Sequence, residues 1–461
     1  MLSKYIGDRA FYRRVIAVAL PIIIQNGIAN FVSLLDNIMI GQVGQIPMSG
    51  VAIVNQLMFV FYLCIFGATS GAGIFTAQFF GSGDEEGVRY TFRFKLMVGA
   101  LLCAVGIGIF LLAGDPLIRL YLTGEGDQAD AESILSYGRE YLLIMLWGLP
   151  AFVLSNAYAG TLRETGQTMV PMIASTSAVF VNLALNWVLI FGHLGFPAMG
   201  VAGAAIATVI SRYAELGIVA IWTHLHSHQA AFIQGAYRTF RIPRALLGKI
   251  ISKSLPLLAN EALWSSGMAV LNQCYSTKGL DVVPAQQISS TIYNLSSVVF
   301  LAMGNAVGII IGQMLGSSET EERVRDTDRK LIFASVVSCL VFGVLMGVIS
   351  PLFPKIYDAT ESVQLLATQL ICVAAVFLPF NGYTNAVYFT LRSGGQTMVT
   401  FLFDSFFVWV FCVPLAFVLS RYTSLPILPL YFICCGTDLI KSILGTIMIK
   451  QGKWIQNLTT Q

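Results

Sequence analysis

Long apolar stretches alternate along the whole chain with short polar ones. An α-helix needs about 20 apolar residues to cross the hydrocarbon core of a bilayer, and twelve stretches reach that length. They predict transmembrane helices at about 14–40, 50–79, 92–113, 134–158, 168–191, 200–223, 254–278, 283–315, 331–352, 362–390, 397–419 and 428–450. Because 56% of the residues are hydrophobic and only 11% are charged, the sequence predicts an all-α integral membrane protein in a lipid bilayer.

One stretch of sequence occurs twice. The segment 149–170 returns at 378–399 with identical residues at 12 of 22 positions and without a gap. An internal match of this quality indicates a tandem duplication. We therefore expect two six-helix lobes, 1–223 and 254–461, joined by a polar linker at 224–253 and related by a pseudo-two-fold axis along the membrane normal.

Basic residues are distributed unevenly between the two sets of predicted loops. Twenty Lys and Arg lie at the termini and in the loops that follow even-numbered helices, against about five in the opposite loops. The positive-inside rule then predicts cytoplasmic termini, and we expect the plasma (inner) membrane as the location. Within the linker, 230–247 fits either an amphipathic helix on the membrane surface or a plain loop.

Seven ionisable residues lie well inside predicted helices, where each costs about 2.5–3.5 kcal/mol on insertion scales. Two sets are spaced i,i+3, so that Arg212 with Glu215, and Asp438 with Lys441, can neutralise each other on one helix face. The alternative for Asp438 is a partner on another helix. The seven are Asp36, Arg212, Glu215, Glu261, Asp404, Asp438 and Lys441.

Three of the acids, Asp36, Glu261 and Asp404, have no such neighbour. An unpaired carboxylate in an apolar medium can exchange a proton near neutral pH or give oxygen ligands to Na⁺. Asn182 and Asn186 are spaced i,i+4, so their carbonyl oxygens could join Asp36 around one cation. The structural alternative is that these polar groups only hydrogen-bond neighbouring helices together.

Two prolines occupy equivalent places in the first and seventh predicted helices. Pro21 and Pro256 each follow a leucine, and each removes one helical hydrogen bond. We predict a hinge at both positions, with a static kink as the alternative.

At these residues the chain resembles a bacterial branch of the multidrug and toxic compound extrusion (MATE) family, over essentially its whole length. The matching stretches are LLDNIMIGQVG around Asp36, VNLALNWVLIFG around Asn182, SLPLLANEALWSSG around Glu261 and both TLR turns. The resemblance implies twelve helices in two lobes that form a V around a central cavity, in a monomer. It also implies export of small organic cations or amphipathic drugs, driven by H⁺ or Na⁺.

The resemblance also implies site residues by position. Asp36 matches the family's carboxylate in the first helix, Asn182 its Asn in the fifth and Thr208 its Thr in the sixth, which together form an ion site in the N-terminal lobe. Glu261 matches the Glu of the seventh helix, which belongs to a site in the C-terminal lobe.

Two positions depart from the family pattern. The family often has Asp four residues after its fifth-helix Asn, where this chain has Asn186 and lacks that charge. Some members carry Asp in the tenth helix, where the aligned residue is Asn381. We infer that Asp404 supplies the missing carboxylate, which would make the C-terminal lobe, with Glu261, the better candidate for ion coupling.

The expected function is therefore a secondary active antiporter that works by alternating access, with substrate and ion competing for one carboxylate. We expect no cofactor and no metal apart from a possible Na⁺ at the coupling residues. The alternative is a flippase for lipid-linked saccharides of the same superfamily. Such proteins often have a cationic cavity, whereas the unpaired ionisable residues inside the predicted helices of this chain are acids. An enzyme is not expected, because no nucleophile or cofactor motif appears, and a net charge of +3 indicates no nucleic-acid partner.

Overall fold

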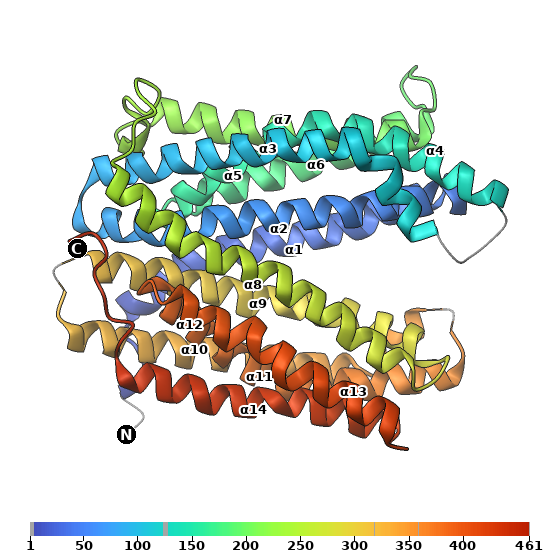
Figure 1. Ribbon diagram of the computed structural model, residues 1–461. Helices are drawn as coiled ribbons and strands as arrows, with labels where there is room; N and C mark the ends of the chain where they lie inside the picture. Colours follow the sequence, from blue (N-terminus) through green and yellow to red (C-terminus); the bar gives the residue numbers. More distant parts are fainter. Residues whose placement is uncertain (1–3, 123–127, 318, 358, 461) are drawn as a thin grey trace. The chain divides into compact units, whose positions relative to one another are not determined.

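The computed structural model describes residues 4–122, 128–317, 319–357 and 359–460, and its regular structure within these ranges is helical throughout (Figure 1). Two of the predicted spans consist of several pieces. The helix α4 continues through a 3₁₀ turn at Leu146–Gly148 into α5, and α12 continues through π-helical turns at Leu402–Phe406 and Val408–Cys412 into α13. The α-helices are α1 (Arg9–Gly41), α2 (Gln45–Ser82), α3 (Glu85–Leu122), α4 (Gln128–Met145), α5 (Leu149–Glu164), α6 (Met169–Phe191), α7 (Gly200–Leu225), α8 (Arg244–Ser276), α9 (Val282–Gly316), α10 (Glu321–Ile349), α11 (Glu361–Ser393), α12 (Thr397–Phe401), α13 (Val413–Tyr422) and α14 (Ile427–Gln451).

These helices follow the twelve predicted apolar runs, so the predicted all-α membrane architecture is confirmed. In the described part of the chain, eleven helices have the length and apolarity of membrane spans. The twelfth is α8, which is more polar because it carries Lys249, Lys253 and Glu261. Several helices begin before their apolar run, as α3 does at Glu85 and α10 at Glu321, because helical hydrogen bonding continues through the polar residues beyond the hydrocarbon core.

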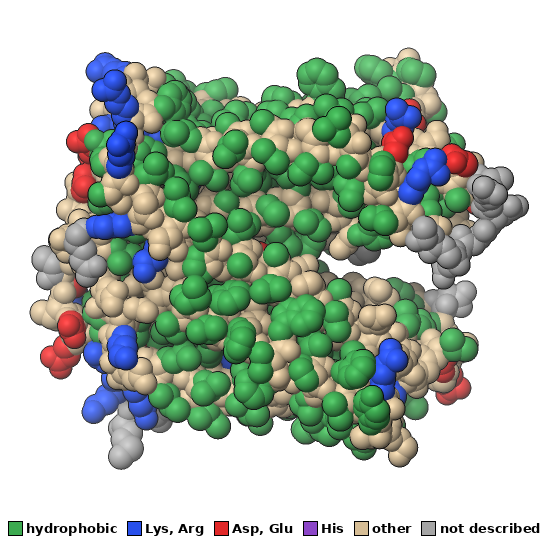
Figure 2. Space-filling model, viewed as in Figure 1, with side chains coloured by type: hydrophobic (Ala, Val, Ile, Leu, Met, Phe, Trp, Pro, Cys, Tyr) green, Lys and Arg blue, Asp and Glu red, His purple; other side chains and the backbone are tan. Residues whose placement is uncertain are grey.

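Apolar side chains cover the middle of the helices, and charged side chains gather near the helix ends on the face shown in Figure 2. Among the large apolar side chains at the surface, Leu112 is 88% exposed and Val348 is 68% exposed. An apolar surface of this extent marks contact with lipid or with another protein rather than with water. The surface therefore agrees with a position in the bilayer.

The chain divides into two compact units. The N-terminal unit comprises Ile24–Thr76 and Glu85–Gly248, and the C-terminal unit comprises Met1–Ile23, Ala77–Asp84 and Lys249–Gln461. Both α1 and α2 therefore contribute residues to each unit.

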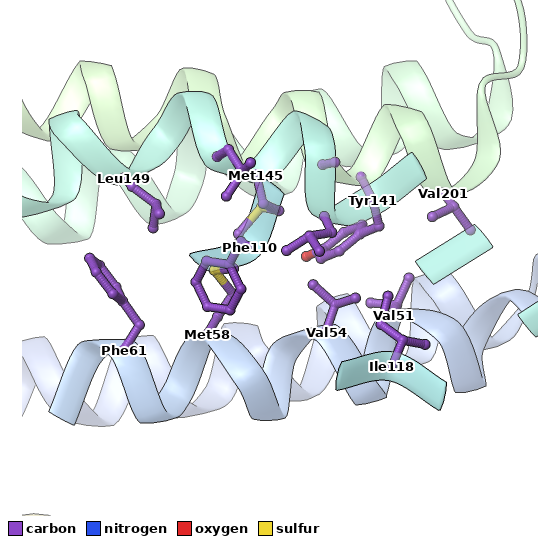
Figure 3. Packing of buried hydrophobic residues seen from close by; sticks show 14 of the residues in the cluster. Val51, Val54, Met58, Phe61, Phe110, Ile118, Tyr141, Met145, Leu149 and Val201 are labelled. Carbon is purple, nitrogen blue, oxygen red and sulfur yellow. The ribbon is translucent and has the colours of Figure 1, made fainter. Parts of the chain in front are cut away.

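Each unit has its own hydrophobic core. In the N-terminal unit, α2, α3 and α5 contribute Phe61, Phe110 and Leu149 to a cluster that Figure 3 shows from close by. In the C-terminal unit, Leu271 of α8 and Leu430 of α14 belong to a separate cluster. These cores fix the helices whose polar side chains form the candidate sites.

The linker between the halves does not form the amphipathic helix considered for 230–247. Its regular part is a single 3₁₀ turn at Ala231–Ile233, and the next helix starts at Arg244. Arg93 of α3 donates hydrogen bonds from Nε to the carbonyl of Ala236 and from Nη2 to that of Gly235, both at 2.8 Å. A helix would need these carbonyls for its own hydrogen bonds. The loop alternative is therefore correct.

Within the C-terminal unit, α2 and α9 approach closely at equivalent positions of the two repeats. A Cβ atom on Gly81 would overlap the carbonyl oxygen of Gln313, and one on Gly316 would overlap that of Gln78. The contact is reciprocal, because both pairs of equivalents are 235 residues apart in the sequence. Small residues are what allow two helix backbones to approach this closely. The buried Gln78 also accepts the backbone N–H of Leu458 at 2.7 Å, so the C-terminal tail binds at the same point.

Adding one methyl group at this contact should destabilise the protein. We expect Gly316→Ala to lower the thermal unfolding midpoint of the purified protein, as overpacking costs about 1–3 kcal/mol. Gly347→Ala in α10 is the matched control, because beyond the backbone of its own helix turn and its two chain neighbours no atom lies within 4 Å of its added Cβ. That control should leave the midpoint unchanged or raise it, since Ala favours a helix over Gly by about 1 kcal/mol. Equal midpoints for the two variants would contradict the close contact.

Candidate functional site

A polar network in the N-terminal unit connects α1, α6 and α7. Asn186 donates from Nδ2 to Oδ1 of Asp36 at 2.8 Å and to Oδ1 of Asn182 at 3.1 Å. Asn182 in turn donates from Nδ2 to the hydroxyl oxygen of Thr208 at 3.3 Å. The structure thus brings together the four residues that the sequence assigned to one ion site.

Helix geometry explains why these side chains meet. Asn182 and Asn186 are four residues apart on α6, so both project from one face, and they are 6% and 1% exposed. Thr208 donates its hydroxyl to the carbonyl of Ala204 one turn earlier in α7 at 3.0 Å. A buried amide without a partner costs about 1–3 kcal/mol. The hydrogen bonds to Asp36 and Thr208 avoid most of that cost.

The amide of Asn182 fits a second orientation that brings it closer to the carboxylate. Turned over, its Nδ2 lies 3.1 Å from both carboxylate oxygens of Asp36, and its Oδ1 accepts from Thr208 at 3.3 Å. In either orientation at least one amide N–H points at Asp36. Among the described residues, Asp36 has no Lys or Arg ion-pair partner, and Oδ1 of Asn186 is buried without a hydrogen bond.

The network lines a cavity of about 560 Å³ inside the N-terminal unit. Its charged lining residues are Asp36, Arg212 and Glu215. Nη1 of Arg212 lies 3.4 Å from Oε2 of Glu215, so the predicted i,i+3 ion pair is confirmed. Tyr141, labelled in Figure 3, adds a hydroxyl that donates to Oδ1 of Asn55 at 3.3 Å. Because Arg212 and Glu215 cancel, the ionised Asp36 gives this lining one net negative charge.

The C-terminal unit holds a carboxylate with a different partner from the one predicted. Nζ of Lys441 on α14 donates to Oδ1 of Asp404 at 2.6 Å, and Nδ2 of Asn260 donates to Oδ2 at 3.1 Å. No ion pair joins Asp438 to Lys441 in the described part of the chain, so that predicted pair is wrong. The long Lys441 side chain instead reaches the π-helical segment and makes a short charge-assisted hydrogen bond there.

The other predicted residues of this unit are more dispersed. Glu261 is half-buried on α8 and makes no hydrogen bond or ion pair among the described residues. Asn381 lines a second cavity, of about 690 Å³, together with Asp438 and Lys441. No hydrogen bond links Glu261, Asp404 and Asn381 in the ranges that the structure covers. Their geometry therefore differs from the closed network around Asp36.

Both predicted hinge prolines lie inside helices. Pro21 is in α1 and Pro256 is in α8. In α1 the boundary between the two units falls between Ile23 and Ile24, two residues after the proline. The helical hydrogen bond that Pro21 removes is therefore missing close to this boundary. The role of Pro21 as a hinge stays a prediction.

Two buried charges were missed in the sequence. Lys95 is 2% exposed, pairs with Glu164 and donates to the hydroxyl of Thr161 at 3.2 Å. In the second half, the hydroxyl of Thr390 donates to the buried Asp328 at 2.6 Å. In the sequence, Lys95 lies near a helix end and belongs to the twenty basic residues assigned to the termini and loops. The available signal was the repeat, since Thr161 and Thr390 are equivalent residues 229 positions apart.

Twelve long helices in two related halves, which enclose polar cavities and carry buried carboxylates in the part of the chain that is described, define a multi-span membrane transporter. The model of the MatE family matches residues 21–188 and 256–418, one segment in each half. The chain belongs to the MatE family.

Individual relatives agree with this assignment. A probable multidrug resistance protein NorM from Thermotoga maritima is 24% identical over 96% of this chain and 93% of its own length. A probable multidrug resistance protein NorM from Shewanella oneidensis is 27% identical, over 91% of this chain and 89% of its own length. A solved structure of a multidrug resistance MATE family transporter in an outward-facing conformation has a TM-score of 0.85 at 21% identity, with 98% of each chain covered. The resemblance to the MATE family is thus confirmed.

Removing one partner of the Asp404–Lys441 ion pair should leave the other charge uncompensated in the membrane interior. We expect Lys441→Met and Asp404→Asn each to lower the thermal unfolding midpoint, because breaking a buried pair costs about 3–5 kcal/mol. The double variant should recover most of the loss. Asp438→Asn, the matched neutralisation on α14, should have a much smaller effect. A double variant less stable than either single one would contradict the pair.

Proposed function

We propose that this protein is a secondary active antiporter that exports cationic or amphipathic organic compounds in exchange for H⁺ or Na⁺. Asp36 supports this proposal most directly. This carboxylate has no basic ion-pair partner among the described residues, and it lines a cavity of about 560 Å³. A cavity of this size accommodates a drug-sized ligand. Its single net negative charge favours a cationic one.

Competition for the charge of Asp36 is the proposed coupling step. An organic cation about 4 Å from a carboxylate gains about 4 kcal/mol at an effective dielectric constant of 20. A proton or Na⁺ on Asp36 removes this attraction, because Arg212 and Glu215 already cancel each other. Loss of even half of the attraction weakens cation binding about 30-fold. Ion entry therefore releases the substrate, and ion departure restores its site.

The oxygen atoms and amide groups around Asp36 influence whether H⁺ or Na⁺ binds there. The oxygens of Asp36, Asn182, Asn186 and Thr208 are hard ligands of the kind that alkali and alkaline-earth cations prefer. Asn186, however, directs its N–H toward the carboxylate, so a Na⁺ ion would require its amide to turn and present the unpartnered Oδ1. A proton requires no such rearrangement. This orientation favours H⁺, with Na⁺ as the alternative.

Alternating access requires the lobes 1–223 and 254–461 to move relative to each other. We propose Pro21 as one hinge, because α1 changes from one compact unit to the other two residues later. Pro256 is its repeat equivalent in α8. We further propose a monomer in the plasma (inner) membrane with both termini cytoplasmic, on the basis of the uneven distribution of Lys and Arg.

Glu261 is the remaining candidate in the C-terminal lobe. Asp404 forms an ion pair with Lys441 at 2.6 Å, so an incoming cation would have to displace that ammonium group and leave it unpaired. Glu261 has no such partner among the described residues. We therefore propose Asp36 as the primary coupling group and Glu261 as a secondary one, which reverses the order expected from the sequence.

Efflux of a fluorescent organic cation from proteoliposomes tests this order. A pH gradient and a Na⁺ gradient are imposed separately on wild type, Asp36→Asn and Glu261→Gln. We expect one gradient to drive efflux by the wild type, Asp36→Asn to abolish that efflux, and Glu261→Gln to retain a substantial part of it. Abolition by Glu261→Gln with full activity of Asp36→Asn would move coupling to the C-terminal lobe.

Equilibrium binding of tetraphenylphosphonium should depend on pH through Asp36. In the wild type, affinity should fall as the pH is lowered, because protonation removes the negative charge that attracts the cation. Asp36→Asn should bind about 30-fold more weakly at high pH and lose the pH dependence, whereas Glu261→Gln should keep it. An unchanged pH profile in Asp36→Asn would refute competition at this carboxylate.

A further inference from the structure

A second cavity in the N-terminal unit is rich in arginine and separate from the Asp36 network. It has a volume of about 540 Å³ and lies between the start of α3 and the loop that connects α7 to α8. Four arginines, Arg89, Arg93, Arg238 and Arg241, line it, with Glu86 as the one acid. The charged lining residues therefore sum to three positive charges. Figure 2 shows Lys and Arg side chains gathered at this end of the unit.

Arg93 builds the wall of the cavity. It is 6% exposed and donates three hydrogen bonds to loop carbonyls, those of Gly235 and Ala236 at 2.8 Å and that of Arg241 at 3.4 Å. These bonds fix the backbone that carries the neighbouring arginines. The cavity is thus a built feature of the fold rather than a chance gathering of mobile side chains.

The other three arginines have unused hydrogen-bonding capacity. Arg89, Arg238 and Arg241 form no ion pair within the described ranges, and Nε of Arg89 is buried without a hydrogen-bond partner. Glu86, the one acid in the lining, accepts a hydrogen bond from the hydroxyl of Tyr90. An unmade hydrogen bond on a buried donor is costly, so a ligand with anionic oxygens would be stabilised here.

The second half of the chain provides an internal comparison. There, Arg325 pairs with Glu321 at 3.9 Å and Arg329 pairs with Asp326 at 4.0 Å. Their repeat equivalents, 236 residues earlier in the sequence, are the two arginines of α3 that line the cavity. In the first half, Glu85 is the equivalent of Glu321 and Tyr90 stands in the place of Asp326. No ion pair joins Glu85 to Arg89 in the described ranges, so these basic positions are paired with acids in the second half only.

Aromatic residues flank the unpaired arginines. Tyr237 is 48% exposed and Phe240 is 50% exposed, and their ring centroids lie 6.4 Å apart. In the sequence they adjoin Arg238 and Arg241. Exposed aromatic rings beside basic side chains are typical of the level at which lipid headgroups meet the hydrocarbon core. A lipid reaches this level more readily than a soluble anion does.

We propose that this cavity binds the phosphate group of an anionic membrane lipid, with Arg89, Arg238 and Arg241 as its ligands. Guanidinium groups bind phosphate oxygens through paired, charge-assisted hydrogen bonds. Basic pockets at the cytoplasmic side of membrane helices recognise anionic headgroups in this way. The inference goes beyond the proposed transport function and does not depend on it.

Thermal unfolding of the full-length protein in detergent tests the site, because a ligand that binds the folded state raises the unfolding midpoint. The protein is titrated with dioctanoyl phosphatidylglycerol, dioctanoyl phosphatidylcholine or inorganic phosphate. The test variants are Arg238→Gln/Arg241→Gln and, separately, Arg89→Gln. The matched control is Arg323→Gln/Arg325→Gln, which removes two arginines that have acidic partners in the second half.

We expect phosphatidylglycerol to raise the midpoint of wild type and control alike, with little effect of phosphatidylcholine. Apparent affinity for phosphatidylglycerol should fall about fivefold for each cavity guanidinium removed. The proposal is overturned if the two lipids stabilise equally or if both cavity variants respond as wild type does. Stabilisation by inorganic phosphate equal to that by phosphatidylglycerol would retain the phosphate chemistry and overturn its assignment to a lipid.

Discussion

The low dielectric of the bilayer is the constraint on which the polar interior of this protein depends, because each charge within it needs a partner. Four of the seven ionisable residues inside the predicted helices form ion pairs in the described ranges. Arg212 pairs with Glu215, and Lys441 pairs with Asp404. Asp36 differs, since amide N–H groups rather than a cation stabilise it. A carboxylate kept in this state can accept an external cation, and the proposed antiport depends on that property.

The two halves share a scaffold but differ in their chemistry. Equivalent glycines let α2 and α9 approach each other reciprocally, so the duplicated sequence still determines how backbones pack. The charged side chains are placed differently: Asp36, whose repeat equivalent is Leu271, has no basic partner among the described residues. Asp404, whose repeat equivalent is Ser175, pairs with Lys441. Arg325 is ion-paired, whereas its equivalent Arg89 forms no ion pair within the described ranges. Duplication thus preserved the packing and left the polar groups free to take different roles.

The sequence was sufficient for the fold and for the contacts of one site. Apolar runs predicted the helices, and the i,i+4 spacing placed Asn182 and Asn186 on one face. Ion pairs between side chains of different helices could not be predicted from the sequence. The i,i+3 spacing identifies only neighbours on one helix, so it predicted that Lys441 pairs with Asp438. The long side chain of Lys441 instead reaches Asp404. The pattern of 230–247 likewise could not indicate that Arg93 binds the loop carbonyls.

In the proposed mechanism, Asp36 holds either the organic cation or the coupling ion, but not both. Ion release on binding measures this directly: tetraphenylphosphonium is added to purified protein in weak buffer while released protons are recorded with a pH indicator and released ²²Na⁺ by counting. We predict that the wild type releases about one H⁺ or Na⁺ per cation bound, and that Asp36→Asn releases none. Cation binding by the wild type without release of either ion, or equal release by Asp36→Asn, would contradict the account.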